Sequence, residues 1–191
     1  MSDYPIFLNL RKKRVLLFGG GSVALRKAKT LIRSGVHLEA RSRDFSKSFF
    51  SFARKHGLKT RKTEVIPGNL RTFALVIAAT SDCVFNRKVS ERCERQSVFV
   101  NVADDPLRST FIVPSSIKRG RFQIAISTGG ASPHLAKMIR LRLAREFGIS
   151  YKSLVNRLAD ERRKMKAVWK SGKKRRFALQ KLAQTQMKRF V

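Results

Sequence analysis

The sequence predicts an α/β protein whose core is a doubly wound parallel sheet. Apolar segments of strand length alternate with helical patterns over about the first 110 residues, and the links between them are short. The segment Phe73 to Thr80 is almost entirely apolar, as expected for a central parallel strand covered on both faces. A glycine-rich turn joins the first such segment, Val15 to Phe18, to a helical pattern.

That turn carries a dinucleotide-binding pattern. Gly19, Gly21 and Ala24 match G-x-G-x-x-G/A in its proper place, after a strand and at the start of a helix. The first glycine permits the tight turn, the second lets the backbone approach a pyrophosphate, and the small alanine lets helix and strand pack closely. The amides that open the helix, at Ser22 and Val23, would hold the phosphate charge. We therefore expect a Rossmann-like cofactor site, the alternative being an ordinary glycine-rich turn.

The second strand, from about Val36, leaves the choice of cofactor open. Glu39 lies at the distance expected for the acid that binds the ribose, but it falls inside the strand. The strand ends with Arg41, Ser42 and Arg43. An acid at this place binds the ribose hydroxyls of NAD, whereas an arginine accepts the additional phosphate of NADP.

Two further strand ends should lie near the ligand, because ligands bind at the carboxyl ends of such strands. Thr80 ends the apolar segment described above, and we assign it to the cofactor. After the predicted strand Val98 to Val102 come two adjacent acids, Asp104 and Asp105. They either make a turn or place one carboxylate at the mouth of the cleft.

The remaining segments complete the expected order. We predict that Tyr4 to Leu8 cover an edge of the sheet, followed in the cofactor domain by a helix Asp44 to His56, a strand Gly57 to Ile66 and a helix Asn86 to Arg95. Beyond this domain we predict a strand Arg121 to Ser127, a glycine loop Thr128 to Gly130 and a helix that Ser132 caps and Pro133 begins. Basic helices follow from Ser150, with a break at Ser171-Gly172. The amides of Thr128, Gly129 and Gly130 could bind substrate carboxylates, or the loop is a mere connection.

Composition limits the classes of protein. With 42% hydrophobic residues the chain can bury a core, and no segment approaches the length of a membrane span. We expect a cytoplasmic location, since the first residues do not form a signal peptide. Two cysteines and three scattered histidines predict no metal site. A net charge of +31 would attract any polyanion without specifying one.

Several motifs together resemble one family, the precorrin-2 dehydrogenase and ferrochelatase module of siroheme synthases. The likeness spans about residues 4 to 150. The matching stretches are Pro5-Ile-Phe, Gly19-Gly-Gly-Ser-Val-Ala with Arg26-Lys-Ala, Ile77-Ala-Ala-Thr with Asn86, Asn101-Val-Ala-Asp, Phe111-Ile-Val-Pro and Ser127-Thr-Gly-Gly-Ala-Ser-Pro.

The resemblance implies an enzyme that oxidises precorrin-2, a tetrapyrrole polycarboxylate, to sirohydrochlorin with NAD. It places the catalytic carboxylate at Asp104, although Asp105 departs from the small residue expected beside it. Asn101, Thr128, Gly129 and Gly130 are then assigned to substrate, with Thr128 at the place of a family serine. Some members also insert ferrous iron, and the chain leaves this second activity open.

The same resemblance implies how the chain is divided. A cofactor-binding domain over residues 1–110 would precede a dimerisation region over 111–149 and a helical domain over 150–191. We therefore expect a homodimer. Two alternatives remain, a dinucleotide sensor without catalysis and a basic nucleic-acid-binding protein, although the chain has no recognised nucleic-acid motif.

Overall fold

The computed structural model describes residues 3–168 and 172–188. The chain forms two compact units that divide between Val113 and Pro114. The three-part division into residues 1–110, 111–149 and 150–191 stays a prediction.

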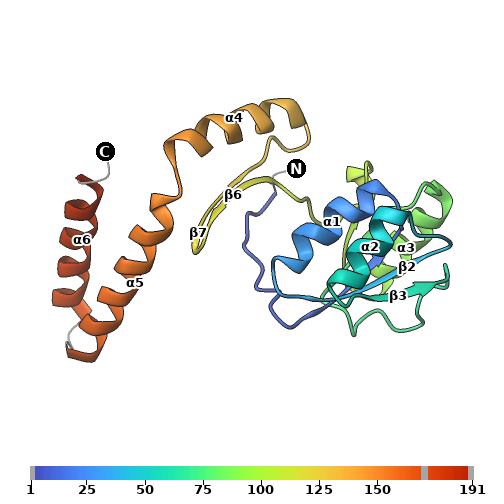
Figure 1. Cartoon of the computed structure of the whole chain (residues 1–191), viewed down its shortest axis with the longest axis horizontal. Coiled ribbons are helices and arrows are strands. Elements are labelled where there is room, and N and C mark those ends of the chain that lie inside the picture. Colours follow the sequence, from blue (N-terminus) through green and yellow to red (C-terminus); the bar gives the residue numbers. More distant parts are fainter. Residues whose placement is uncertain (1–2, 169–171, 189–191) are drawn as a thin grey trace. The chain divides into compact units, whose positions relative to one another are not determined.

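The first unit is built on a five-stranded parallel sheet with the order β3-β2-β1-β4-β5. Figure 1 labels two of its strands, β2 and β3. The strands are β1 Arg14–Phe18, β2 His37–Ser42, β3 Lys59–Lys62, β4 Leu75–Ala78 and β5 Phe99–Val102. The chain winds outward from β1 in one direction to β3 and then crosses back to β4 and β5. This order confirms the predicted doubly wound fold.

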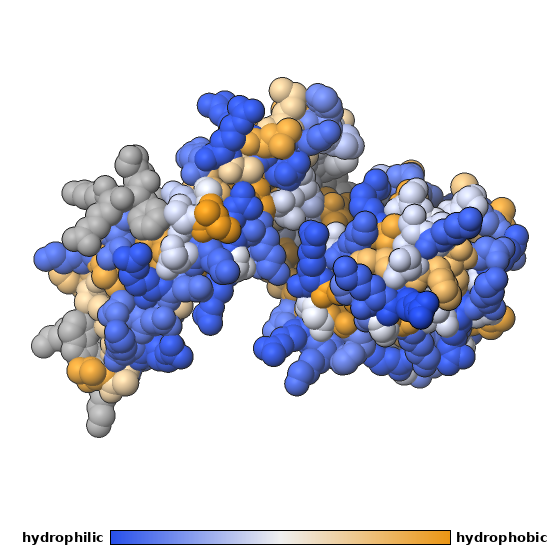
Figure 2. All heavy atoms as spheres, viewed as in Figure 1, coloured by the Kyte–Doolittle hydropathy of each residue, from blue (hydrophilic) through white to orange (hydrophobic). Residues whose placement is uncertain are grey.

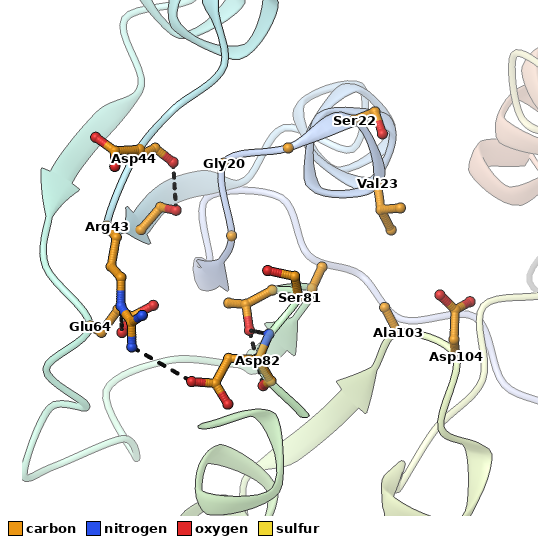
Figure 3. A pocket seen from close by; sticks show the side chains of 15 residues that line it. Gly20, Ser22, Val23, Arg43, Asp44, Glu64, Ser81, Asp82, Ala103 and Asp104 are labelled. Carbon is orange, nitrogen blue, oxygen red and sulfur yellow. Dashed lines mark hydrogen bonds and ion pairs between the residues drawn. The ribbon is translucent and has the colours of Figure 1, made fainter. Parts of the chain in front are cut away.

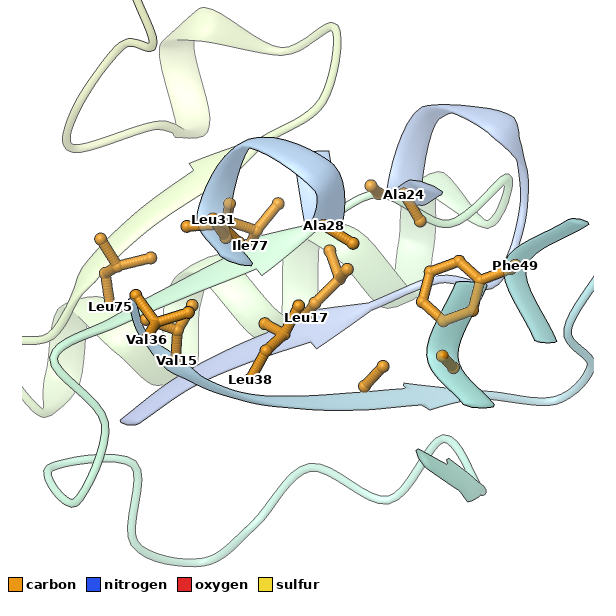
Figure 4. Close-up of a cluster of buried hydrophobic side chains, with 13 residues drawn as sticks. Val15, Leu17, Ala24, Ala28, Leu31, Val36, Leu38, Phe49, Leu75 and Ile77 are labelled. Atoms are coloured by element: carbon orange, nitrogen blue, oxygen red, sulfur yellow. The ribbon is translucent and has the colours of Figure 1, made fainter. Parts of the chain in front are cut away.

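Helices cover both faces of this sheet, and the strand residues alternate between them. Val15 and Leu17 pack with α1 (Ser22–Ile32) and α2 (Lys47–Lys55) in the cluster drawn in Figure 4. Leu16 and Phe18 point to the other face and pack with α3 (Cys83–Arg95). The near-continuous apolar strands predicted this two-sided burial.

Element boundaries differ from the expected ones where tertiary contacts decide them. Helix α3 starts before the expected Asn86, because the Asp82 carboxylate accepts a hydrogen bond from the Phe85 amide at 2.9 Å and caps the helix. Strand β3 ends at Lys62 instead of Ile66, because its partner strand ends opposite it at Ser42.

The first residues do not cover an edge of the sheet, as Tyr4 to Leu8 were expected to do. This segment forms no strand, and its apolar side chains are exposed, Tyr4 to 88%. Only Leu10, further along, packs against the core. The prediction was wrong because apolar composition alone does not supply a strand with a hydrogen-bonding partner.

The second unit consists of a hairpin and three helices. Its elements are β6 Ser115–Arg119, β7 Phe122–Ile126, α4 Pro133–Glu146, α5 Ser150–Val168 and α6 Gly172–Lys188. The Ser132 hydroxyl accepts a hydrogen bond from the Leu135 amide at 3.2 Å, which confirms the predicted cap of α4. The rings of Phe122, Phe147 and Tyr151 pack together, with centroids 5.1 to 5.4 Å apart. Of the expected break at Ser171-Gly172, Ser171 lies outside the described residues.

The visible face of the molecule is mostly hydrophilic, with separate hydrophobic areas (Figure 2). No helix in the described ranges is long and apolar enough to cross a membrane.

Candidate functional site

A pocket of about 510 Å³ opens at the carboxyl ends of the strands in the first unit. It is the site that the doubly wound fold offers to a ligand. Its lining residues are Gly19, Gly20, Gly21, Ser22, Val23, Ser42, Arg43, Asp44, Glu64, Ala79, Thr80, Ser81, Asp82, Ala103 and Asp104 (Figure 3).

The glycine loop is shaped by close contacts with its own protein on one side and by open space on the other. Gly19 has φ +121°, and a Cβ there would lie 2.2 Å from the Ala79 carbonyl oxygen. A Cβ on Gly20 would lie 2.2 Å from the backbone oxygen of Asp44. A Cβ on Gly21 would meet nothing within 4 Å. The first two glycines therefore serve the fold, and the third leaves room for a ligand to approach the backbone.

Helix α1 begins directly at this open space. Gly21 is its N-cap and provides no side-chain acceptor, so the amides of the first turn are not capped by a side chain. Ser22 and Val23 line the pocket, as expected of residues that present these amides to a phosphate. Ala24 is fully buried behind the loop, 3.3 Å from the position of a Cβ on Gly19. Its role is close packing, as the pattern predicted.

The carboxyl end of β2 separates the predicted cofactor residues into two groups. Ser42 and Arg43 line the pocket, whereas Arg41 does not. The Arg41 guanidinium donates to the Glu39 carboxylate at 2.8 and 2.9 Å and to the Val65 carbonyl at 2.8 Å. Arg41 therefore fixes the chain after β3 and does not face the ligand space.

Glu39 is buried in the sheet among cations. Besides Arg41, the cations Arg14, Lys59 and Arg61 lie 3.5 to 3.8 Å from its carboxylate. Burial raises the pKa of Glu39, but the hydrogen bond from Arg41 and the charges of Arg41, Lys59 and Arg61 outweigh it and lower the pKa overall. Glu39 is thus an internal ion-pair partner and does not line the pocket.

The end of β4 is held by a local hydrogen-bond network. Thr80, which lines the pocket, donates its hydroxyl proton to buried Asn86 at 2.7 Å, and the Asn86 amide donates to the Thr80 carbonyl at 3.0 Å. The Thr80 hydroxyl also accepts from the Asp82 amide at 3.2 Å. This network links Thr80 at the end of β4 to Asn86 in α3.

The two adjacent acids after β5, Asp104 and Asp105, have different roles in the structure. Asp105 accepts from the Arg108 amide at 3.3 Å and lies 3.4 Å from the Arg108 guanidinium, so it caps the short 3-10 helix η1 (Pro106–Arg108). Asp104 lines the pocket with φ +62°, an unusual backbone conformation for a residue other than glycine. No described residue forms a hydrogen bond or ion pair with its carboxylate. One acid makes the turn and the other faces the pocket.

Asn101 is buried, and its side chain forms hydrogen bonds within the first unit. Its amide oxygen accepts from Lys27 Nζ at 2.7 Å, and its amide nitrogen donates to the Phe111 carbonyl at 3.1 Å. Burial and the charge of Arg26 lower the pKa of Lys27, and the charge of Asp104 opposes them. Asn101 does not line the pocket, so its assignment to substrate stays a prediction.

The predicted substrate loop lies in the second unit, between β7 and α4. Thr128 accepts a hydrogen bond from the Ser132 amide at 3.1 Å, and Gly129 and Gly130 have φ +60° and +85°. Glycine adopts such positive φ values without strain. The assignment of these three residues to substrate also stays a prediction.

Seven lining residues were not assigned to the site from the sequence: Gly20, Asp44, Glu64, Ala79, Ser81, Asp82 and Ala103. Glu64 follows β3, so the rule that strand ends carry the site could have found it. Four lining residues are acidic, namely Asp44, Glu64, Asp82 and Asp104, and Arg43 is the one cation among them. In a chain with 43 basic and 12 acidic residues, the pocket is therefore a locally acidic region. Among the described residues, no group of three or more histidine, cysteine, aspartate or glutamate side chains is placed so that it could hold a metal ion.

The glycine loop, the uncapped helix start and the pocket at the strand ends define a dinucleotide-binding protein of the Rossmann-like class. A family model for NAD(P)-binding proteins matches residues 6–115, and a second, for the central part of sirohaem biosynthesis proteins, matches residues 119–146. The chain belongs to this NAD(P)-binding family.

Curated relatives agree with the motifs in the sequence. A siroheme synthase of Nitrosomonas eutropha is 36% identical over 185 residues, which is 96% of this chain and 39% of the relative. Siroheme synthase 2 of Klebsiella pneumoniae is 41% identical over 143 residues, which is 75% of this chain and 31% of the relative. The resemblance to siroheme synthases is thus confirmed. The chain spans less than two fifths of the length of these relatives.

A solved structure has the same fold along nearly the whole chain. SirC, a precorrin-2 dehydrogenase, matches with a TM-score of 0.75 and covers 98% of both chains at 23% identity. The fold expected from the sequence, a sheet domain followed by a helical part, is therefore confirmed.

Proposed function

We propose that this chain oxidises precorrin-2 to sirohydrochlorin with NAD as the hydride acceptor. The relatives named above are siroheme synthases, and the structure with the same fold is a precorrin-2 dehydrogenase. The observation that carries the proposal is the pocket, where the glycine loop and an unpaired carboxylate, Asp104, line one space.

The residues of the pocket fit a nicotinamide dinucleotide. The open space at Gly21 and the uncapped amides at Ser22 and Val23 suit its pyrophosphate. Thr80 and Ala103, at the ends of the two adjacent strands, would bound the opposite side. When bound, the cofactor supplies the hydride acceptor, and the chain supplies position and electrostatics.

Asp104 would accept the proton that the substrate loses, or orient the substrate. No described residue forms a hydrogen bond or ion pair with its carboxylate, so it can accept a proton or a hydrogen bond from a ligand. The loop of Asp105 and Arg108 holds the backbone that presents it. A positioned carboxylate of this kind contributes about 100-fold or more to the rate of a proton transfer.

The test is an anaerobic assay with purified protein, freshly generated precorrin-2 and NAD, which follows NADH and the sirohydrochlorin spectrum. Asp104→Asn should lower kcat about 100-fold or more. Asp105→Asn is the matched control, because Asp105 caps η1 and should leave most of the turnover intact. Equal turnover by Asp104→Asn and wild type would remove Asp104 from the mechanism. No turnover with NAD or NADP by a protein that binds them would favour a sensor.

Iron insertion is a separate activity that the same preparation can test. Ferrous iron would be a substrate here, and proton removal from the pyrrole nitrogens would need a base such as Asp104. Addition of ferrous iron after the oxidation is complete should produce the siroheme spectrum only if the chain is also a chelatase.

We also propose that the protein is a homodimer, with α4 in the interface. Leu135, Met138 and Leu141 on this helix are 46 to 56% exposed. Apolar side chains grouped on one helix are typical of a surface that another chain covers.

Binding of the polycarboxylate substrate and of other polyanions would be assisted by the net charge of +31. A cytoplasmic location remains a prediction.

A further inference from the structure

We propose that Glu64 and Asp82 neutralise Arg43 and thereby make the pocket select a dinucleotide without a 2′-phosphate. This inference rests on the proposed function, in that it requires the pocket to bind a nicotinamide dinucleotide. It assigns the selection to Glu64, which lies outside the strand that usually carries the discriminating residue.

Arg43 lies at the position where Rossmann-like dinucleotide-binding proteins contact the adenosine ribose. It follows the last residue of β2, Ser42, and both line the pocket. In this class an acid at that strand end binds the ribose hydroxyls, whereas an arginine nearby accommodates a 2′-phosphate. By sequence position alone, Arg43 would therefore favour NADP.

The contacts of Arg43 reverse that expectation. Arg43 Nε donates to Glu64 Oε2, and Arg43 Nη2 lies 3.6 Å from Asp82 Oδ2 (Figure 3). The guanidinium thus already faces two carboxylates. A phosphate that approaches it would meet a guanidinium whose charge is already balanced by two carboxylates.

Both acids are held by the fold, whereas the arginine is more exposed. The Glu64 side chain is 21% exposed and the Arg43 side chain 70% exposed. The Val65 carbonyl, next to Glu64, is fixed by Arg41, and Asp82 is fixed as the cap of α3. Glu64 and Asp82 are therefore held in place by the fold, and the more exposed Arg43 side chain extends to contact them.

The local charge also opposes a phosphate. Glu64 and Asp82 both line the pocket and both pair with Arg43, so two carboxylates face one guanidinium. A phosphate monoester carries nearly two negative charges at pH 7, and like charges brought together are destabilising. A ribose hydroxyl instead can donate a hydrogen bond to a carboxylate.

The experiment is isothermal titration of the full chain with NAD and NADP, without precorrin-2. The wild type should bind NAD more tightly. Glu64→Gln should free Arg43 and shift the ratio of the two dissociation constants at least about tenfold toward NADP. Arg43→Ala in addition to Glu64→Gln should remove that shift, because the gain depends on the released guanidinium.

Asp44→Asn is the matched control for the charge. Asp44 lines the same pocket, but its 86% exposed carboxylate pairs with Lys62 at 3.2 Å. It should change the ratio far less than Glu64→Gln. Equal ratios in wild type and Glu64→Gln, or a wild type that prefers NADP, would overturn the inference. Failure to bind either dinucleotide would instead overturn the cofactor assignment, and NAD binding without turnover would overturn only the proposed reaction.

Discussion

Glu39 shows why the spacing of a residue does not establish its role. It lies at the distance from the glycine loop at which a ribose-binding acid is expected, yet its side chain is only 7% exposed and surrounded by Arg14, Arg41, Lys59 and Arg61. The alternation of a strand turns it away from the α1 side, onto the face that carries Leu16. Its place in the sheet makes it a partner for cations.

The ion pairs of Glu39 should contribute measurably to stability. Glu39→Gln should lower the free energy of unfolding by about 2 kcal/mol at pH 7, because the partly buried guanidinium of Arg41 loses a charged acceptor. Chemical denaturation followed by circular dichroism would measure this. Exposed Glu94→Gln is the control and should change the value by less than about 0.5 kcal/mol.

The pH dependence of this effect has a definite sign. The folded-state pKa of Glu39 is lowered from 4.5, so its contribution is complete above that value and disappears as the pH falls through the lowered pKa. The difference between wild type and Glu39→Gln should therefore shrink below about pH 4.5. A difference that stays constant down to pH 3 would contradict this account.

At the scale of elements, the glycine loop offers a matched pair of substitutions. Gly20→Ala should destabilise the protein by about 3 kcal/mol, because its Cβ would overlap the Asp44 backbone oxygen. Gly21→Ala should change stability by no more than about 1 kcal/mol, because its Cβ meets open space. Its effect should appear in NAD affinity, which we expect to fall tenfold or more.

Thermal melts and NAD titrations of the two variants would separate folding from binding. The interpretation of the loop would fail if Gly20→Ala were as stable as wild type. It would also fail if Gly21→Ala bound NAD as tightly as wild type.

The sequence predicted the parts of the site that depend on local patterns. Gly19, Gly21 and Ala24 were found because their order along the chain sets their positions on the turn and helix. The contact of Gly20 with Asp44 joins two segments that no local pattern relates. The same holds for the pair Arg43 and Glu64. Such long-range contacts require the assembled sheet.

The two adjacent acids at the end of β5 illustrate the same limit. From the sequence, Asp104 and Asp105 could equally form a turn or place a carboxylate in the site. The structure gives Asp105 to the turn through Arg108 and leaves Asp104 facing the pocket. The difference between them is a matter of backbone direction, which φ +62° at Asp104 sets.

At the scale of the whole molecule, the proposed homodimer can be tested through α4. Met138→Glu places a charge among exposed apolar side chains and should raise the dimer dissociation constant tenfold or more. Size-exclusion chromatography with light scattering over a range of concentrations would measure it. Val168→Glu, at an exposed apolar residue of α5, is the control and should leave the mass unchanged. A wild type that is monomeric at every concentration would contradict the proposal.

The charge of the molecule is unevenly divided. The chain carries a net +31, yet four of its 12 acidic residues line one pocket. A general cationic surface attracts polyanions at long range, but salt screens this attraction. Contacts inside the pocket act at short range and are less screened. In the proposed scheme, long-range attraction of polyanions and selection of the cofactor would therefore depend on different residues.

The two cysteines differ in a way that makes a chemical reporter available. Burial raises the pKa of the Cys93 thiol to about 12, which keeps it unreactive, whereas Cys83 is exposed. Cys83 directly follows Asp82, a lining residue of the pocket. A maleimide dye should therefore label the native protein at a single place, on the rim of the cofactor pocket. Its fluorescence would follow the arrival of the dinucleotide in real time, with no tetrapyrrole present.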